Sequence, residues 1–217
     1  MKTKKVEINY EPVNILYEDA FLIAAFKPPF LLVHNDGNSQ DTLQARINGY
    51  LQLNGNKYPA QAIHRIDYET SGLVLFCKHP FFQAYCDKNM EEHHIKKDYI
   101  ALVQGHTNYK NKKIVSNIAR DRHNAKKMII HPNGKESISI FNTLKNYKDY
   151  SLIQVSILTG RKHQIRVQCA SLKHPILNDS LYGGKRIDNT GLLLQSHHIQ
   201  FNDIDVICPQ EKRFIRK

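Results

Sequence analysis

The chain has 217 residues, a formal net charge of +11 at pH 7 and 41% hydrophobic residues, so it is long enough to bury a core without disulfides or metal ions. No apolar stretch approaches the roughly 18 residues that a membrane-spanning helix needs, and the basic start has no apolar signal-peptide core. Composition therefore argues against a secreted or membrane-spanning protein, and the excess of Lys and Arg is typical of proteins that bind phosphate-rich partners.

The cysteines indicate a reducing compartment. They show no CxxC spacing, and two of them lie in apolar segments, where a free thiol commonly acts as a small buried hydrophobe. We therefore expect a cytoplasmic protein. The four cysteines are Cys77, Cys86, Cys169 and Cys208.

The first predicted elements are two short strands in residues 13–33. They are separated at Lys27-Pro28-Pro29, because consecutive prolines can continue neither a strand ladder nor a helix. A helix is predicted within residues 39–55, with Ser39 or Asp41 as its N-cap and Asn54-Gly55 as its stop. Its apolar positions recur at helical spacing: Leu43, Ile47, Tyr50 and Leu51.

A buried strand is predicted at "GLVLFCK", residues 72–78, which is a continuous apolar run of strand length. Residues 79–94 predict a helix with Pro80 in its first turn. Residues 96–106 return to a strand pattern. One face of the predicted helix is formed by Phe82, Tyr85, Cys86 and Asn89.

The second half of the chain begins with residues 107–136, whose weak periodicity predicts a basic insertion of turns and short strands. Residues 137–161 alternate around a polar turn and predict a long hairpin. A helix is expected over residues 163–173 and a further strand over residues 191–201. The basic tail, residues 210–217, shows no clear structure.

Polar residues are unusually dense in "HRIDYETSG", residues 64–72, directly before the predicted buried strand. Polar groups beside a core strand are costly unless they are used. Asp67, two residues after Arg65, could be a nucleophile, a general base or one half of a structural ion pair. The residues by themselves leave these three alternatives open.

A second polar cluster lies in "TGRKHQIR", residues 159–166, around the predicted helix start. It contains Arg161, Lys162, His163 and Arg166, and free backbone N–H groups and the helix dipole favour anions at such a position. The segment is either a phosphate or carboxylate site or a solvated basic helix end.

Five segments together resemble the motifs of the RluA-type pseudouridine synthases. "HRIDYETSGLVLFCK" resembles HRLDxxTSGLLLxAK, and "KPPFLLVH" resembles KPxGLxVH. "KDYIALVQG" is similar to KxYxAxVxG, and "LLLQSHHIQF" is similar to LxLHAxxLxF. "TGRKHQIRVQCASLKHPILNDSLYGG" is similar to TGRxHQIRVHxxxxGxPIxGDxxYG. The motifs occur in the family's order, from about Ile15 to Pro209.

This resemblance implies roles for individual residues. Asp67 falls on the catalytic aspartate that isomerises uridine to pseudouridine, and Arg166 falls on the arginine that pairs with it. Tyr99 falls on the ring that stacks on the target uracil, and Arg65 falls on the arginine that helps to replace the flipped base. We expect four further residues to contact RNA, and we place the two lysines among them on a basic rim. These residues are Arg161, His163, Lys27 and Lys97.

The resemblance also implies an α+β fold, with a mixed, largely antiparallel central sheet flanked by helices and a cleft across its middle. We expect a single catalytic domain over residues 1–217, with a core at about residues 13–209 and without the N-terminal S4-like domain of many relatives. The related proteins act on ribosomal RNA, transfer RNA or both, and without an S4-like domain we expect the partner to be a compact stem-loop of such an RNA. The family uses no metal or organic cofactor, so we expect none here. We expect a monomer.

The physics of the reaction agrees with these roles. The bond from ribose C1′ to uracil N1 must break and the base must turn and rejoin through C5, so the nucleotide must leave its stack at a cost of a few kcal/mol. Tyr99 can stack on the extruded base, which is worth about 1 to 3 kcal/mol, while Arg65 fills the vacated space. Asp67 must be ionised to act at C1′ or C2′, and the Arg166 guanidinium favours that form.

Among the departures from the family's motifs are four positions in the last two of them. Gln168 and Gln195 stand where the family usually has His, and Lys173 and Asn178 stand at frequent glycine positions. The last two departures put the backbone geometry of residues 173–179 in question.

Two other functions compete with this interpretation. One is a catalytically inactive, basic RNA-binding module of the same fold, but RNA binding alone would not require the Asp67 carboxylate, which repels phosphate. The other is a metal-dependent hydrolase built on the 12 histidines, but their adjacent pairs should diverge and no HxxxH with a nearby Glu occurs.

Overall fold

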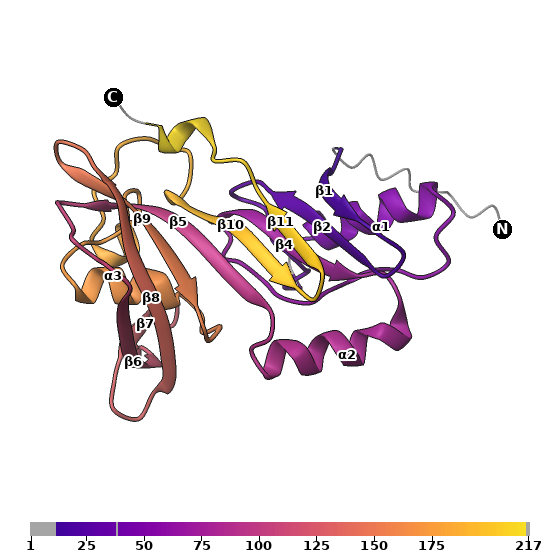
Figure 1. The fold of residues 1–217 in the computed structure, drawn as a ribbon, viewed down its shortest axis with the longest axis horizontal. Helices are drawn as coiled ribbons and strands as arrows, with labels where there is room; N and C mark the ends of the chain where they lie inside the picture. The colour runs from indigo at the N-terminus through magenta and orange to yellow at the C-terminus, as the bar shows by residue number, and fades with distance from the viewer. Residues whose placement is uncertain (1–11, 38, 216–217) are drawn as a thin grey trace.

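The computed structural model describes residues 12–37 and 39–215, and in this part of the chain eleven strands and three α-helices are formed (Figure 1). The strands are β1 (Asn14–Glu18), β2 (Leu22–Lys27), β3 (Gln61–Ala62), β4 (Ser71–Cys77), β5 (Lys96–Gln104), β6 (Lys112–Arg120), β7 (Met128–Ile130), β8 (Lys135–Asn146), β9 (Tyr150–Ile157), β10 (Leu194–Phe201) and β11 (Ile204–Ile207). The helices are α1 (Leu43–Leu53), α2 (Pro80–Glu91) and α3 (Gln164–Ser171), with 3-10 turns at Ser180–Tyr182 and Lys212–Phe214.

All eleven strands belong to one sheet, in the order β1-β2-β4-β10-β5-β9-β8-β6-β7, with β3 paired to β4 and β11 paired to β10. The β4–β10 pair is parallel, and the other strand pairs of the described chain are antiparallel. The predicted α+β fold with a mixed, largely antiparallel sheet is therefore confirmed. Strands that are far apart in the sequence meet at its centre, where β4, β10 and β5 lie side by side.

β4 is the buried strand that its apolar run predicts, and every one of its residues is buried. Val74 and Phe76 belong to the same hydrophobic cluster as Ile47 of α1. Leu73 and Leu75 belong to a second cluster, with Cys86 of α2. Because side chains alternate across a strand, β4 supplies both clusters at once, and this explains why it lacks the polar alternation of a half-exposed strand.

The N-terminal strands lie differently from their prediction. β1 and β2 both precede the prolines, since β2 ends at Lys27. The chain turns between them at Asp19, whose carboxylate accepts hydrogen bonds from the N–H groups of Phe21 and Leu22 at 2.8 and 2.7 Å. Between the prolines and α1, the described residues form no strand and only an isolated bridge, from Leu32 to Thr42. The prediction relied on the prolines and missed the turn signal at Asp19, whose side chain accepts hydrogen bonds from two nearby backbone N–H groups.

The N-cap of α1 differs from both predicted residues. Its N-cap is Thr42, whose Oγ1 accepts from the N–H of Ala45 at 3.1 Å, so neither Ser39 nor Asp41 has that position. The predicted stop is confirmed, because Asn54 is the C-cap and Gly55 has a φ of 77°.

The prediction of turns and short strands for residues 107–136 was wrong for β6, which has nine residues and pairs with β8 over seven of them. The sheet therefore continues through this basic segment, on the left in Figure 1. Of the nine β6 side chains only Ile118 is buried. A strand with so little burial needs few apolar residues, which is why its alternation is weak in the sequence.

The tail is ordered where the sequence predicted no clear structure. Phe214 is fully buried, in a cluster with Ile100, Leu102 and Leu193. Glu211 and Arg213 both hydrogen-bond the hydroxyl of Ser71, with the Arg213 Nη2 at 2.6 Å. The last two residues of the predicted tail and the first eleven residues of the chain lie outside the described part. No helix in that part is long and apolar enough to cross a membrane.

His198 of β10 forms a charged cluster with carboxylates from the two neighbouring strands β5 and β11. The Nδ1 of His198 lies 2.9 Å from the Asp98 carboxylate on β5, and its Nε2 lies 2.7 Å from the Asp205 carboxylate on β11. Burial would lower the pKa of His198, but the two carboxylates outweigh burial and raise it.

We predict that Phe214→Ala lowers the free energy of unfolding by about 3 to 5 kcal/mol, because it opens a cavity in a closed cluster. Ile215→Ala is the matched control, since Ile215 is 65% exposed, and it should change the same quantity by at most about 0.5 kcal/mol. Both are measured by urea denaturation. Equal losses would contradict the packed tail.

We predict that the stability advantage of the wild type over His198→Gln is larger at pH 5.5 than at pH 9. The folded pKa is raised, so the contribution is fully present below the unfolded value of about 6.5 and disappears as the pH rises through the folded pKa. Urea denaturation at both pH values measures it, and Asp205→Asn should shrink the difference. An advantage that does not change with pH would refute the assignment.

Candidate active site

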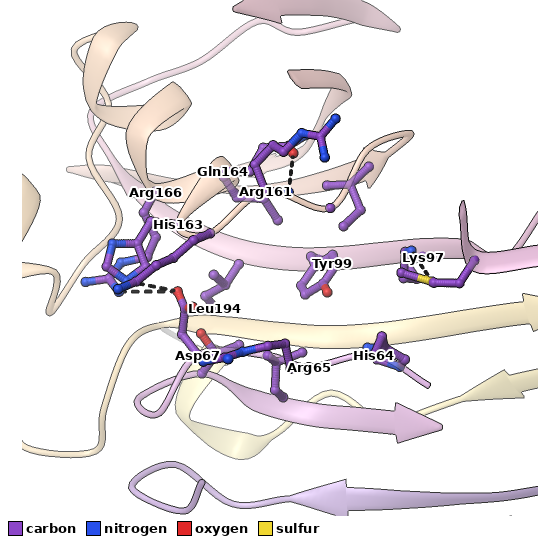
Figure 2. A pocket seen from close by; sticks show the side chains of 17 residues that line it. His64, Arg65, Asp67, Lys97, Tyr99, Arg161, His163, Gln164, Arg166 and Leu194 are labelled. Atoms are coloured by element: carbon purple, nitrogen blue, oxygen red, sulfur yellow. Dashed lines mark hydrogen bonds and ion pairs between the residues drawn. The ribbon is translucent and has the colours of Figure 1, made fainter. Parts of the chain in front are cut away.

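An open pocket of about 400 Å³ lies at the centre of the sheet, between the loop that precedes β4 and the segment that enters α3 (Figure 2). It brings together residues from positions 64 to 194, so the tertiary fold assembles it. Seven of the eight side chains singled out from the sequence line it: Arg65, Asp67, Lys97, Tyr99, Arg161, His163 and Arg166.

The loop that carries Asp67 is held by the strand that follows it. Gly72, the second residue of β4, has a φ of 112°, and a Cβ at this position would lie 2.2 Å from the carbonyl oxygen of Ser196. Only glycine permits this approach of β4 to β10. His64 fixes the other end of the loop, since its Nε2 accepts from the N–H of Leu75 at 3.1 Å. Burial lowers the pKa of His64 to about 3, which keeps the accepting ring neutral.

Arg166 is the central cation of the pocket, and its side chain is only 4% exposed. Its Nε and Nη2 donate to the two oxygens of Asp179, both at 2.8 Å. The remaining Nη1 donates to Asp67 at 3.3 Å, and Glu69 lies 3.9 Å from Nη2. Burial alone would lower the pKa of Arg166, but Asp179 and then Asp67 raise it above its ordinary value.

The resemblance predicted the contact of Arg166 with Asp67, but the sequence analysis did not identify Asp179 as the closer partner. Asp179 is 1% exposed, and a carboxylate so deeply buried needs a partner. The sequence did contain a signal for such a partner: Asp179 is the one acidic residue in "PILNDSLYGG", and no Lys or Arg follows it until Lys185.

His163 lies beside this pair, on a left-handed residue at the start of α3 with a φ of 55°. Its Nδ1 lies 2.9 Å from the hydroxyl of Tyr182, and its Nε2 lies 3.9 Å from Asp67. Burial lowers the pKa of His163 to about 4, and the Asp67 carboxylate offsets only part of that effect. At neutral pH the ring is therefore uncharged.

Tyr99 and two arginines complete the pocket. Figure 2 shows Tyr99 on β5, between the loop with Arg65 and Asp67 and the segment with Arg161. Tyr99 is 6% exposed, and burial raises its pKa, so its hydroxyl stays protonated. Arg65 is exposed and lies 3.5 Å from His34, while the Nε of Arg161 donates to the carbonyl of Glu136. The pocket thus contains an aromatic ring with a protonated hydroxyl and a carboxylate, together with the two arginine side chains.

Lys27 does not lie on the rim, so that prediction was wrong. It is 0% exposed, and its ammonium donates to the carbonyls of Pro28, Leu31 and Tyr68 at 2.8, 2.8 and 3.1 Å. Prolines contribute no N–H donors, so the inward-facing carbonyls of this loop need a side-chain donor. Burial lowers the pKa of Lys27 to about 7.

Lys97 lines the pocket, but from its wall rather than its rim. It is 5% exposed, and its Nζ lies 3.2 Å from the sulfur of Met90. Burial lowers the pKa of Lys97 to about 8.

The four departures from the expected motifs are accommodated. Lys173 and Asn178 have φ values of 66° and 67°, so both keep the left-handed conformation that glycine would adopt more easily. Gln168 is buried and bonded to the hydroxyls of Ser116 and Ser139. Gln195 donates to the carbonyl of Pro209 at 2.8 Å and so holds the tail.

Within residues 12–37 and 39–215, no group of three or more His, Cys, Asp or Glu side chains is placed to hold a metal ion.

Residues 22–171 match the RNA pseudouridylate synthase family. An uncharacterized RNA pseudouridine synthase of Bacillus subtilis, YhcT, is 36% identical over 203 residues, which cover 92% of this chain and 66% of that protein. Ribosomal large subunit pseudouridine synthase D of Borreliella burgdorferi is 32% identical over 215 residues, which cover 94% of this chain and 64% of that protein. This chain therefore spans slightly less than two thirds of the length of either relative.

A solved structure of human RNA pseudouridylate synthase domain containing 1 has the same fold. Its TM-score is 0.79 at 23% identity, over 92% of this chain and 84% of that chain.

We predict that Asp179→Asn lowers the free energy of unfolding by about 3 to 5 kcal/mol, because it leaves the buried Arg166 guanidinium without its bidentate carboxylate. Asp149→Asn, at an exposed position, is the control and should stay within about 0.5 kcal/mol. Urea denaturation measures both. If the two variants were equally stable, Asp179 would not anchor Arg166.

Proposed function

The chain belongs to the RNA pseudouridylate synthase family, and from this premise we propose that it isomerises uridines in structured RNA to pseudouridine, with Asp67 as the catalytic carboxylate. The observation that carries the proposal is the position of Asp67, 3.3 Å from the buried guanidinium of Arg166 and in one pocket with Tyr99. The basic surface, net charge +11, supports RNA as the partner.

Asp67 acts in its ionised form. Arg166 donates a hydrogen bond to the carboxylate and favours its charged state. An ionised carboxylate serves either as a nucleophile at C1′ or as a base at C2′, and both routes break the C1′–N1 bond and form the C1′–C5 bond. The C5 proton leaves in the last step. The reaction is an isomerisation, so it balances without an oxidant or reductant.

Tyr99 and Arg65 handle the flipped nucleotide. A base stacked on the ring of Tyr99 gains about 1 to 3 kcal/mol, which offsets part of the few kcal/mol that unstacking costs. Arg65, exposed at the pocket, is long enough to occupy the space that the base leaves. His163 is a neutral neighbour of Asp67, because burial lowers its pKa to about 4, and its Nδ1 lies in hydrogen-bonding distance of the Tyr182 hydroxyl, at 2.9 Å.

The RNA is a stem-loop of ribosomal or transfer RNA, and the described residues act as one catalytic domain, as a monomer in the cytoplasm. Two features support ribosomal RNA as the substrate and a single catalytic domain. Borreliella burgdorferi ribosomal large subunit pseudouridine synthase D is among the relatives, and one continuous sheet contains every described strand. The exposed basic residues on and beside β6 and β7 would extend contact with the phosphate backbone: Lys112, Lys113, Arg120, Arg122 and Lys126.

We predict that the protein releases tritium from C5-tritiated uridine in unmodified ribosomal and transfer RNA transcripts, and that Asp67→Asn lowers the release rate by roughly 100-fold or more. C5 loses its hydrogen only if the base is turned and rejoined. Asp203→Asn, which changes an exposed carboxylate in the β10–β11 turn, should release tritium like the wild type.

The control for RNA binding separates the two candidate functions. If neither the wild type nor Asp67→Asn releases tritium while both still bind RNA with a steep salt dependence, the chain is an RNA-binding module and not an enzyme.

A further inference from the structure

Phe30 has a backbone conformation that its side chain disfavours. Seven non-glycine residues of the described chain have a positive φ, and five of them are Asn or His, which tolerate this region best. The other two are Lys173 and Phe30, the latter with a φ of 63°. Position 30 is a glycine in the KPxGLxVH motif quoted above, so the aromatic ring is a departure of this chain. Strain of this kind persists where surrounding structure holds it, and it is concentrated at binding sites.

The ring of Phe30 is not used to fill the core. It is 47% exposed, and its one ring neighbour in the described chain is Tyr68, which is 50% exposed. The two rings are 5.9 Å apart at 66°, an edge-to-face contact. They therefore form an open aromatic corner on the surface.

Backbone contacts attach this corner to the Asp67 loop. The N–H of Phe30 donates to the carbonyl of Tyr68 at 2.8 Å, and the buried ammonium of Lys27 donates to the same carbonyl at 3.1 Å. Tyr68 directly follows Asp67 in the chain. A movement of the corner would therefore move the loop that carries Asp67.

A second pocket, of about 120 Å³, adjoins the corner. Phe30 and Glu69 line one side of it, and Ser180, Arg186 and Asn189 supply polar groups. The two pockets have no lining residue in common, but they lie close together, because Arg166 of the first pocket lies 3.3 Å from Asp67, which also lines the first, and 3.9 Å from Glu69, which lines the second. A nucleotide bound in the second pocket is thus next to one bound in the first.

We propose that Phe30 and Tyr68 form a stacking subsite for the base of a nucleotide that neighbours the target uridine in the RNA, with Glu69 and Arg186 at the base edge. This inference rests on the proposed function for the identity of the target. Exposed aromatic rings in a basic protein are stacking platforms for single-stranded bases. The Glu69 carboxylate accepts hydrogen bonds and repels phosphate, so it favours a base with an exocyclic amino group at this position.

The direct test uses a ribonucleotide nonamer of uridines with one 2-aminopurine beside the central uridine. Its fluorescence falls when the aminopurine stacks on an aromatic ring. We expect Asp67→Asn, which binds without turnover, to quench the fluorescence, and the doubly substituted Asp67→Asn/Phe30→Gly and Asp67→Asn/Tyr68→Ala to lose most of the quenching. Asp67→Asn/Phe81→Ala, whose second change removes an 87% exposed ring on α2, should quench like Asp67→Asn.

The melting temperature distinguishes loss of the stacking ring from loss of folding. Phe30→Gly should not lower the melting temperature, because glycine adopts a positive φ without strain. Quenching that survives both ring substitutions, or no quenching by Asp67→Asn on either side of the central uridine, would overturn the subsite.

Turnover separates the subsite from the proposed function. In the tritium assay, Phe30→Gly should lower kcat/KM by about 5- to 150-fold, mainly through KM, which is the range expected for one lost base stack. Wild-type release that Phe30→Gly leaves unchanged would overturn the subsite and leave the proposed function intact. Quenching without any tritium release by the wild type would support the stacking subsite and contradict the proposed enzymatic function.

Discussion

The buried guanidinium of Arg166 is the interaction on which the rest of the site depends. An arginine with a 4% exposed side chain is stable only with a partner for its charge, and Asp179 supplies one in bidentate form. That pairing leaves one nitrogen pointing at Asp67. The same cation thus fixes the geometry of the pocket and favours the ionised state of the carboxylate, so structure and chemistry share one interaction.

The Asp67 loop is held by three segments that are distant from it in the sequence. Lys27 bonds the carbonyl of Tyr68, Gly72 allows β4 to approach β10, and Arg213 of the tail bonds the hydroxyl of Ser71. Each attachment uses buried or half-buried polar groups, which are costly to leave unpaired. A loop with its ends fixed in this way can hold its side chains precisely although it has no regular secondary structure of its own.

The electrostatics of the pocket are simpler than its residue types suggest. His163 is uncharged at neutral pH because burial lowers its pKa to about 4, and burial lowers the pKa of Lys97 to about 8. The buried cation nearest Asp67 is therefore Arg166, whose guanidinium donates to the Asp67 carboxylate at 3.3 Å. This distribution suits a site that must attract a polyanion to its mouth and still keep one carboxylate ionised inside.

The sequence by itself determined what depends on local pattern. The apolar run of β4, the helical spacing of α1 and the turn before α3 were all predictable, and the motifs around Asp67, Tyr99 and Arg166 were sufficient to group the pocket residues. These features are written in neighbouring residues, because side-chain period and turn chemistry act over a few positions.

Only the tertiary structure decided which polar groups face one another. It placed Lys27 under the loop instead of on the rim, joined Asp179 to Arg166, packed Phe214 into the core and set Phe30 beside Tyr68. Most of these partners are far apart in the sequence, up to the 142 residues that separate Arg213 from Ser71. A buried charge or an unpaired carbonyl takes whichever partner the fold brings within hydrogen-bonding distance, and no local pattern encodes that choice.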